Sequence, residues 1–389
     1  MTAKGVKNTG IRERNIESIL RLLYSKNLSA THIAKALKLS KTAVFKILTE
    51  MESMHLVENL AGNGDENEKY KRTLYAIKQD AGILGVLEFG STYIKIVFSY
   101  LNGQIFDETT IEDREFLTSN DLDEIAQIIL NKKKQFETDT CKMISVVVST
   151  PGQINKFEDE IENSVKFKLI KQVKVRQFFE DKLGLNIILK NDINLAMLGE
   201  QHYGMVERVA DSGILIYIDS GIGGAILNEN KIIDGDFGYA AEFGLISTFD
   251  QFGNSLVYDL ICSINSIKKQ IAYQQFVGKQ VNLEPDFRYR HVVKAFYEKD
   301  PVVMETVKYT AHKIGELISN LSYIFNYKQF FIGGRIKALG QQYIGWVSEA
   351  MVEDLKQVSV KYTTLGDENI IYGAIHIGLT HAFSVVAKR

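Results

Sequence analysis

The strongest constraint on the fold of this chain is a pair of apolar strands that each run directly into a glycine-rich turn. ILGVLEF (83–89) leads into GST (90–92), and GILIYI (213–218) leads into DSGIGGA (219–225). Glycine turns between strands are common, but the backbone N–H groups of such a turn can also cradle a phosphate. The turns by themselves leave both interpretations open.

Strands and helices alternate over the rest of the body. We expect a helix at 121–134, buried strands at 143–148 and 186–190, helical stretches within 255–325, and a late strand at 329–332. A hairpin turn is expected at Leu101-Asn102-Gly103, with the Asn-Gly pair supplying positive φ angles. This alternation predicts an α/β body.

The first 56 residues predict three short helices before any strand. Ser29 or Thr31 can cap the second helix, and Ser40 can cap the third after a tight turn at 38–40. Two short helices joined by a tight turn, after a longer helix, form the helix-turn-helix plan.

The outward residues near the start of the third helix are Lys41, Thr42, Phe45 and Lys46. In a helix-turn-helix this part of the second helix of the motif meets the base edges of the major groove. Lys can reach guanine acceptors or phosphates, Thr can serve several bases, and Phe can contact a thymine methyl. A small helical bundle with a solvated basic face is the alternative that this pattern leaves open.

Two strands with a polar loop between them follow the third helix and would form a wing. The strands are HLVENL (55–60) and YKRTLYAI (70–77). His55 is expected in a left-handed position where the third helix ends, because His tolerates that conformation better than most residues. Lys69, Lys71 and Arg72 could touch DNA phosphates from the wing.

Charge separates the head from the body. Residues 1–56 carry a net charge of +6 and the remainder −8, as expected for a DNA-binding head on a body that does not bind DNA. No run approaches the roughly eighteen apolar residues of a membrane span, and no secretory signal is expected. Cys141 and Cys262 are far apart in sequence, which indicates two free thiols in a cytoplasmic protein.

Taken in order, these features resemble the ROK family, named for repressors, open reading frames and kinases. IRERNIESILRLL, LSKTAVFKIL and HLVEN are similar to the winged-helix head of the family's repressors. LGVLEFGSTYIK is similar to its first phosphate motif, and later family motifs follow in the family's order: STPGQIN, NDINLAMLGEQHYG, DSGIGGAIL, GDFGYAAEFG and FFIGGR. The resemblance covers nearly the whole chain.

The resemblance implies an α/β chain with a winged helix-turn-helix at 1–80 and a ROK domain at 81–389. That domain would have the two-lobed, actin-like fold of sugar kinases, a ribonuclease H-like architecture. Its small lobe would span about 81–195 together with the C-terminal helix, and its large lobe about 196–370. A sugar or sugar phosphate would bind in the cleft between the lobes.

The resemblance also places sugar-hydroxyl contacts on Asn191, Asp192 and Glu242. Asp192 matches the general base of the family's kinases. A carboxylate can orient a sugar through its hydroxyls, and one beside the reacting hydroxyl can remove its proton. Without the resemblance, the Asn-Asp pair could merely cap the next helix.

The departures from the family pattern concern metal and phosphate binding. The zinc segment is replaced by STFDQFGNSLVYDL (247–260), which contains no Cys or His, whereas a zinc site needs about four N or S ligands. We therefore expect no metal. Leu245 stands in place of a His, and Val257 is the nearest match to a family Glu.

The phosphate loops are expected to be degenerate. Glu88 stands where the family has Asp, and Asp219 adds a fixed negative charge that would repel phosphates. The loop residues concerned are Glu88, Gly90 and Thr92 in the first motif and Ser220, Gly221 and Gly223 in the second. No resident cofactor is expected, and whether ATP still binds is left open.

Three functions compete: a sugar-responsive repressor that binds operator DNA, an ATP-dependent sugar kinase with a DNA-binding extension, and a DNA-binding protein whose body is only an oligomerisation scaffold. The head favours the first and third, and retention of the three sugar-site residues favours the first over the third. We expect a repressor and not an enzyme, with residual kinase activity left open. Family precedent favours release of DNA by ligand, and a homodimer or dimer of dimers that binds an inverted repeat.

Overall fold

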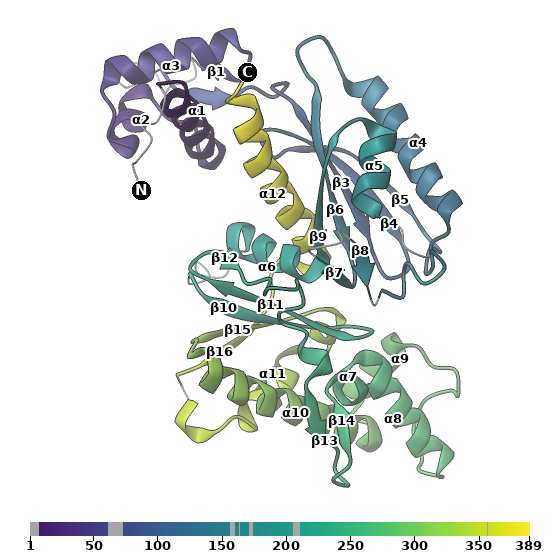
Figure 1. Cartoon of the computed structure of the whole chain (residues 1–389). Helices are drawn as coiled ribbons and strands as arrows, with labels where there is room; N and C mark the ends of the chain where they lie inside the picture. Colours follow the sequence, from purple (N-terminus) through teal and green to yellow (C-terminus); the bar gives the residue numbers. More distant parts are fainter. Residues whose placement is uncertain are drawn as a thin grey trace. The chain divides into compact units, whose positions relative to one another are not determined.

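The computed structural model describes residues 8–60, 73–155, 160–162, 164–170, 174–204, 211–355 and 357–389. The chain forms two compact units (Figure 1). The first unit contains residues 1–153, 158–192 and 374–389, and the second contains residues 154–157 and 193–373.

The first unit begins with the predicted helical head. Its elements are α1 (Asn8–Ser25), α2 (Ala30–Leu37), α3 (Lys41–Ser53), β1 (Val57–Asn59) and β2 (Tyr75–Ile77), and the two strands pair antiparallel. The apolar stripes of the helices meet in a small core, in which Ile16, Leu20, Ile33 and Leu48 are fully buried. Three helices followed by a β-hairpin form the predicted winged helix-turn-helix.

A five-stranded sheet with the order β5-β4-β3-β6-β9 follows the head. Its strands are β3 (Ile83–Phe89), β4 (Ile94–Tyr100), β5 (Ile105–Ile111), β6 (Met143–Thr150) and β9 (Asn186–Asn191). β3, β4 and β5 are antiparallel neighbours, and β6 and β9 continue the sheet in parallel. β3 is buried along its whole length, which explains its continuous apolar sequence.

Helices cover both faces of this sheet (Figure 1). α4 (Ser119–Phe136) and α5 (Val175–Leu183) lie on one face, and the C-terminal part of α12 (Asn369–Val386) lies on the other. The short strands β7 (Gln153–Asn155) and β8 (Glu160–Glu162) come between β6 and α5 in the chain.

The turn between β4 and β5 differs from its prediction. Only Gly103 has a positive φ there, at 84°, so the expectation of a positive φ at Asn102 was wrong. The backbone N of Tyr100 donates to the carbonyl O of Gln104 at 3.0 Å, which closes a loop of the three residues 101–103. A three-residue loop needs one left-handed residue at its end, whereas a two-residue Asn-Gly turn needs two. Asn102 contributes through its side chain, whose Oδ1 accepts a hydrogen bond from the backbone N of Gln104 at 3.0 Å.

The C-terminal helix α12 packs against both the sheet and the head of the first unit. A Cβ at Gly378 would lie 3.2 Å from the side chains of Leu84 and Val147, so the helix and the sheet are in close contact. Phe383 meets Tyr24 of α1 edge to face, with 6.2 Å between ring centroids. α12 is long and apolar enough to cross a membrane, but 61% of it is buried inside the protein, as in the core helix of a soluble protein.

The second unit repeats the same sheet topology, with the order β12-β11-β10-β15-β16. Its strands are β10 (Gly213–Ile218), β11 (Ile222–Asn228), β12 (Lys231–Ile232), β15 (Gln329–Gly333) and β16 (Ser359–Tyr362). Again the central strand, β10, pairs antiparallel with β11 on one side and parallel with β15 on the other. The outer strands continue these patterns, since β12 is antiparallel to β11 and β16 is parallel to β15. Two sheets of identical order define the predicted actin-like, ribonuclease H-like fold of sugar kinases.

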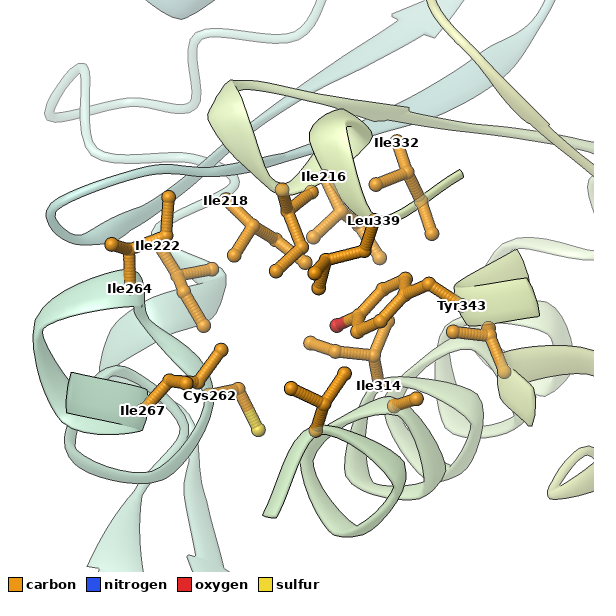
Figure 2. Packing of buried hydrophobic residues seen from close by; sticks show 14 of the residues in the cluster. Ile216, Ile218, Ile222, Cys262, Ile264, Ile267, Ile314, Ile332, Leu339 and Tyr343 are labelled. Atoms are coloured by element: carbon orange, nitrogen blue, oxygen red, sulfur yellow. The ribbon is translucent and has the colours of Figure 1, made fainter. Parts of the chain in front are cut away.

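A large apolar core lies between the second sheet and its helices. The helices of this core are α7 (Asp259–Cys262), α8 (Ile264–Phe276), α9 (Tyr289–Tyr297), α10 (Pro301–Phe325) and α11 (Gly340–Glu349). Helix α6 (Asp192–Tyr203) precedes β10 in the chain. Figure 2 shows Ile216 and Ile332 of the sheet in the same cluster as Ile314 of α10 and Tyr343 of α11. All four side chains are fully buried, so the core fixes the end of β10, where the second candidate phosphate turn begins.

Candidate DNA-binding face and sugar site

Helix α3 presents the four predicted DNA-binding residues to solvent. Its start is fixed by Ser40, whose hydroxyl accepts a hydrogen bond from the backbone N of Ala43 at 3.1 Å, as predicted for a cap. Val44, Leu48 and Met51 are fully buried on its inner side. Since the opposite side of the helix must then face outward, Lys41, Thr42, Phe45 and Lys46 are all exposed.

The composition of this face is unusual for a merely solvated helix. Phe45 is 50% exposed, although a side chain of this size is normally buried. Neither Lys41 nor Lys46 forms an ion pair with any described residue. An uncovered aromatic ring between unpaired lysines can meet both a thymine methyl and the phosphates beside it.

The base of the wing follows α3, as expected. His55 adopts φ 57°, which confirms the predicted left-handed position at the end of the helix. The turn between α2 and α3 uses a second left-handed residue, Lys38, with φ 55°. The predicted wing residues Lys69, Lys71 and Arg72 lie outside the described residues.

Asn191 and Asp192 lie where β9 ends and α6 begins. Both are half-buried, and the side-chain Nδ2 of Asn191 donates to the carbonyl O of Gly152 at 3.1 Å. The bond joins the end of β9 to the turn after β6, so it orients the amide. Asp192 is the first residue of α6, and a carboxylate stabilises a helix when it lies at the N-terminus. A contribution of Asp192 to helix stability is therefore expected whatever else it binds.

Glu242 lies in the second unit, in a strained and closely packed loop. Ala241, directly before it, has φ 67°, which is rare for a residue with a Cβ and costs energy. Phe243, directly after it, packs so closely on Gly224 of β11 that a Cβ there would collide with its ring. Strain held in place by packing is frequent at ligand sites. Assembly of Glu242 with Asn191 and Asp192 into one site stays a prediction.

A residue that the sequence analysis missed ties α6 to the loop before Glu242. Asn194 Nδ2 donates to Asp234 Oδ1 at 3.2 Å. Asp234 directly precedes the quoted segment GDFGYAAEFG (235–244), so an acidic residue just before the first glycine of that segment was the available signal. The contact positions the first turn of α6 within the second unit.

The first phosphate loop is filled by one of its own side chains. The ring of Tyr93 lies over Gly90 so closely that a Cβ at that glycine would collide with it. The Tyr93 hydroxyl donates to Glu88 Oε1 at 2.7 Å, and Glu88 is buried at the end of β3. Thr92 is exposed, and its carbonyl accepts a hydrogen bond from the backbone N of Arg114 at 2.7 Å. A phosphate could reach this turn only after the tyrosine had moved.

We expect Tyr93→Phe to destabilise the first unit. The substitution removes the phenol hydrogen bond to the buried Glu88, and a lost hydrogen bond to a charged buried group costs about 1–3 kcal/mol. Thermal unfolding should therefore begin at a lower temperature than in the wild type. Tyr100→Phe, at the far end of β4, is the matched control. Equal unfolding midpoints for the two variants would contradict a stabilising Glu88–Tyr93 bond.

The N–H groups of the second glycine turn are already bound to carboxylates. The backbone N of Ser220 donates to Asp219 Oδ1 at 2.6 Å, and that of Ile222 donates to Asp259 Oδ1 at 2.7 Å. Asp259 Oδ1 would also lie 3.0 Å from a Cβ at Gly221. Because the turn donates to anions of its own protein, a nucleotide phosphate would have to displace them. Gly223 is not part of the turn, since it pairs with Tyr217 inside β11.

The negative charge of Asp219, which was predicted to repel phosphates, is paired within the protein. The guanidinium of Arg335 pairs with it, with Nε 2.9 Å from Oδ2, and the backbone N of Arg335 donates to the same oxygen at 3.2 Å. Hydrogen bonding to Asp219 raises the pKa of Arg335 above its ordinary value. The charge of Asp219 is thus balanced by Arg335, whereas the carboxylate of Asp259 accepts a hydrogen bond from the turn itself.

A β-hairpin occupies the stretch where the family's zinc segment would lie. β13 (Ser247–Phe249) and β14 (Ser255–Val257) pair antiparallel. Asp250 closes the turn between them, because its Oδ1 accepts hydrogen bonds from the backbone N of Phe252 and of Asn254, both at 2.8 Å. The hairpin is held by hydrogen bonds within its own turn.

A winged helix-turn-helix joined to a duplicated actin-like fold with altered phosphate turns defines a class of regulator related to sugar kinases. The model of the ROK family matches residues 84–380, and the chain belongs to that family. It is 24% identical to the xylose repressor of Caldicellulosiruptor bescii, over 93% of this chain and 94% of that protein. It is 22% identical to a beta-glucoside kinase of Klebsiella pneumoniae, over 68% of this chain and 87% of that protein.

A solved structure has the same fold over nearly the whole chain. It is a ROK family transcriptional regulator described as a homolog of the Escherichia coli MLC protein. The TM-score is 0.79 at 18% identity, and the match covers 97% of this chain and 99% of that one. The head and the body of this chain therefore both have counterparts in one known regulator fold.

Proposed function

We propose that this protein is a sugar-responsive transcriptional repressor that binds operator DNA through α3. The observation that carries the proposal is the exposed face of α3, a capped and well-packed helix. It presents an uncovered Phe45 and two lysines that form no ion pair with the residues that the structure describes. A relative that matches nearly the whole chain is named a xylose repressor, which supports the proposal. The test is selection of a binding site from random-sequence DNA by the full-length protein.

The proposal includes a defined mode of DNA binding. A homodimer, or a dimer of dimers, would place two copies of α3 on an inverted repeat, with half-sites about one helical turn apart. Lys69, Lys71 and Arg72 would add phosphate contacts that tolerate any sequence and weaken with salt. The protein would act in the cytoplasm.

The ligand of the body would be a sugar or sugar phosphate held by Asn191, Asp192 and Glu242. Xylose is the first compound to test, because a relative is named for it. A ligand in excess over its dissociation constant stabilises the folded protein by a few kcal/mol. A thermal-shift screen of sugars and sugar phosphates, with and without ATP-Mg, would therefore identify it. The proposal includes no resident metal or cofactor.

We expect sugar kinase activity to be weak or absent. Phosphoryl transfer depends on holding the triphosphate against the attacking hydroxyl. Here Tyr93 covers one loop, and Asp259 accepts the hydrogen bond of a backbone N–H of the other. A coupled ADP-release assay over hexoses, pentoses and amino sugars should give turnover below about one per second. Faster turnover on any of these sugars would favour the alternative of a kinase with a DNA-binding extension.

A further inference from the structure

The DNA-binding head is joined to the rest of the first unit by a short connection that is itself packed. Residues 78–82 separate β2 of the head from β3 of the sheet. The backbone N of Ala81 donates to the carbonyl O of Lys78 at 3.1 Å, and Ala81 is buried. A Cβ at Gly82 would lie 2.8 Å from the side chain of Ile144 in β6. The connection is therefore an ordered turn, unlike the polar or glycine-rich linkers of tethered domains.

Helix α1 of the head meets the first unit at a second place, the turn between β4 and β5. A Cβ at Gly103 of that turn would lie 2.8 Å from the hydroxyl oxygen of Tyr24. The ring of the same tyrosine meets Phe383 of α12 edge to face. Tyr24 is thus in contact with the β4–β5 turn and with α12 at once.

Two arginines of α1 extend the contact with α12. Arg21 Nη1 donates to Thr380 Oγ1, and Arg12 Nη1 donates to the carbonyl O of Ala387, both at 3.4 Å. Thr380, Phe383 and Ala387 follow one another at intervals of three and four residues, which places them on one face of the helix. The contact between α1 and α12 therefore extends along about two helical turns.

Arg12 connects α12 with α3 as well. Its Nε donates to Glu50 Oε1 at 2.7 Å, and its Nη2 lies 3.7 Å from the sulfur of Met54. Glu50 belongs to the C-terminal part of α3, and the other end of that helix carries Lys41 and Thr42. One guanidinium thus touches both α3 and α12. It can hold them in a fixed relation because its donors form a rigid plane.

We propose that this docking holds the head in one orientation on the first unit, with Arg12 as the positioning residue that sets the direction of α3. The fixed orientation then determines which spacing of operator half-sites the protein accepts. The inference rests on the proposed function, because it needs a dimer that binds an inverted repeat. A head on a flexible linker could follow half-sites of several spacings, whereas a docked head reaches its half-site at one spacing.

The test is a spacing series on the operator that the full-length protein selects from random-sequence DNA. Two base pairs inserted between the half-sites move one of them by about 7 Å and rotate it by about 70° around the duplex axis. The readout is the dissociation constant for the extended operator divided by that for the selected operator. We expect a ratio of at least about ten for the wild type, because only one docked head then stays in register.

Arg12→Gln, Arg21→Gln and Tyr24→Ala together remove the described contacts of α1 with α12 and with the β4–β5 turn. The three side chains are at least partly exposed, so the buried core of the head should stay intact and the circular dichroism spectrum unchanged. We expect the ratio to fall below about three, because heads released from α12 can adjust to the new spacing. The double variant that retains Tyr24 should give an intermediate ratio, and it takes the place of the triple variant if the latter does not fold.

Arg14→Gln combined with Lys26→Gln is the matched control for the loss of two positive charges. Both residues are exposed, and among the described residues neither is hydrogen-bonded or ion-paired with α12. The control should keep the wild-type ratio, even if the lost charges weaken its binding to both DNAs.

The inference is wrong if the wild-type ratio is below about three, if the folded triple variant keeps the wild-type ratio, or if the control loses it. A selected site with a single half-site would also overturn the inference and leave the proposed repressor function intact. If the wild type selected no site at all, the proposed function would fail, and the inference with it.

Discussion

Replacement of Lys41, Thr42 and Lys46 together by Ala is expected to abolish specific operator binding. Each side chain is exposed on the outward face of α3, and each base contact of this kind contributes about 1–3 kcal/mol of discrimination. Loss of several contacts should reduce the affinity to that for unrelated DNA. The measurement is a mobility-shift or anisotropy titration on the selected operator, with competitor DNA of random sequence.

The core of the head should be unaffected, because Val44, Leu48 and Met51 hold α3 from the other side. The triple variant should therefore unfold at the wild-type temperature. Lys134→Ala, an exposed lysine on α4, is the control for loss of positive charge and should bind operator normally. Specific binding by a protein of residues 82–389 alone would show that the head had been wrongly assigned.

Asp192→Ala and Glu242→Ala are each expected to weaken sugar binding by about 1–3 kcal/mol, the scale of a hydrogen bond to a charged group. This corresponds to a dissociation constant raised by roughly 5- to 150-fold. Both variants should still bind the operator, but they should need more sugar to release it. The measurement is a sugar titration by calorimetry together with operator release at increasing sugar concentration.

The helix-terminal position of Asp192 requires a separate readout. If Asp192 only stabilised the start of α6, Asp192→Ala would lower the unfolding temperature and leave the sugar affinity unchanged. Asp192→Asn keeps a helix-capping side chain but removes the charge, so it should retain stability and lose affinity if the carboxylate binds sugar. Unchanged affinity in both Asp192→Ala and Glu242→Ala would remove these residues from the site.

Much of the fold was predictable because the signals involved are local. A serine before an apolar stripe caps a helix through donors two or three residues away, so Ser40 could be assigned from its neighbours alone. The left-handed conformation of His55 could be predicted because His55 directly follows the end of the third helix. The buried strand 83–89 follows from its continuous apolar run. The order of the family motifs along the chain then predicted the two-lobed, actin-like fold.

The state of the second candidate phosphate loop was decided only by the tertiary structure. From its neighbours alone, Asp219 was predicted to be a negative charge that repels phosphates, yet its partner Arg335 is 116 residues away in the sequence. Asp259 accepts a hydrogen bond from the second turn, and its donor, the backbone N of Ile222, is 37 residues away in the sequence. The partner of a charged group depends on which distant segments the core brings together, and no local pattern contains that information. The sequence by itself determined where the helices, strands and turns lie, whereas the packing of the second sheet against its helices decided which polar groups of those turns are already bound within the protein.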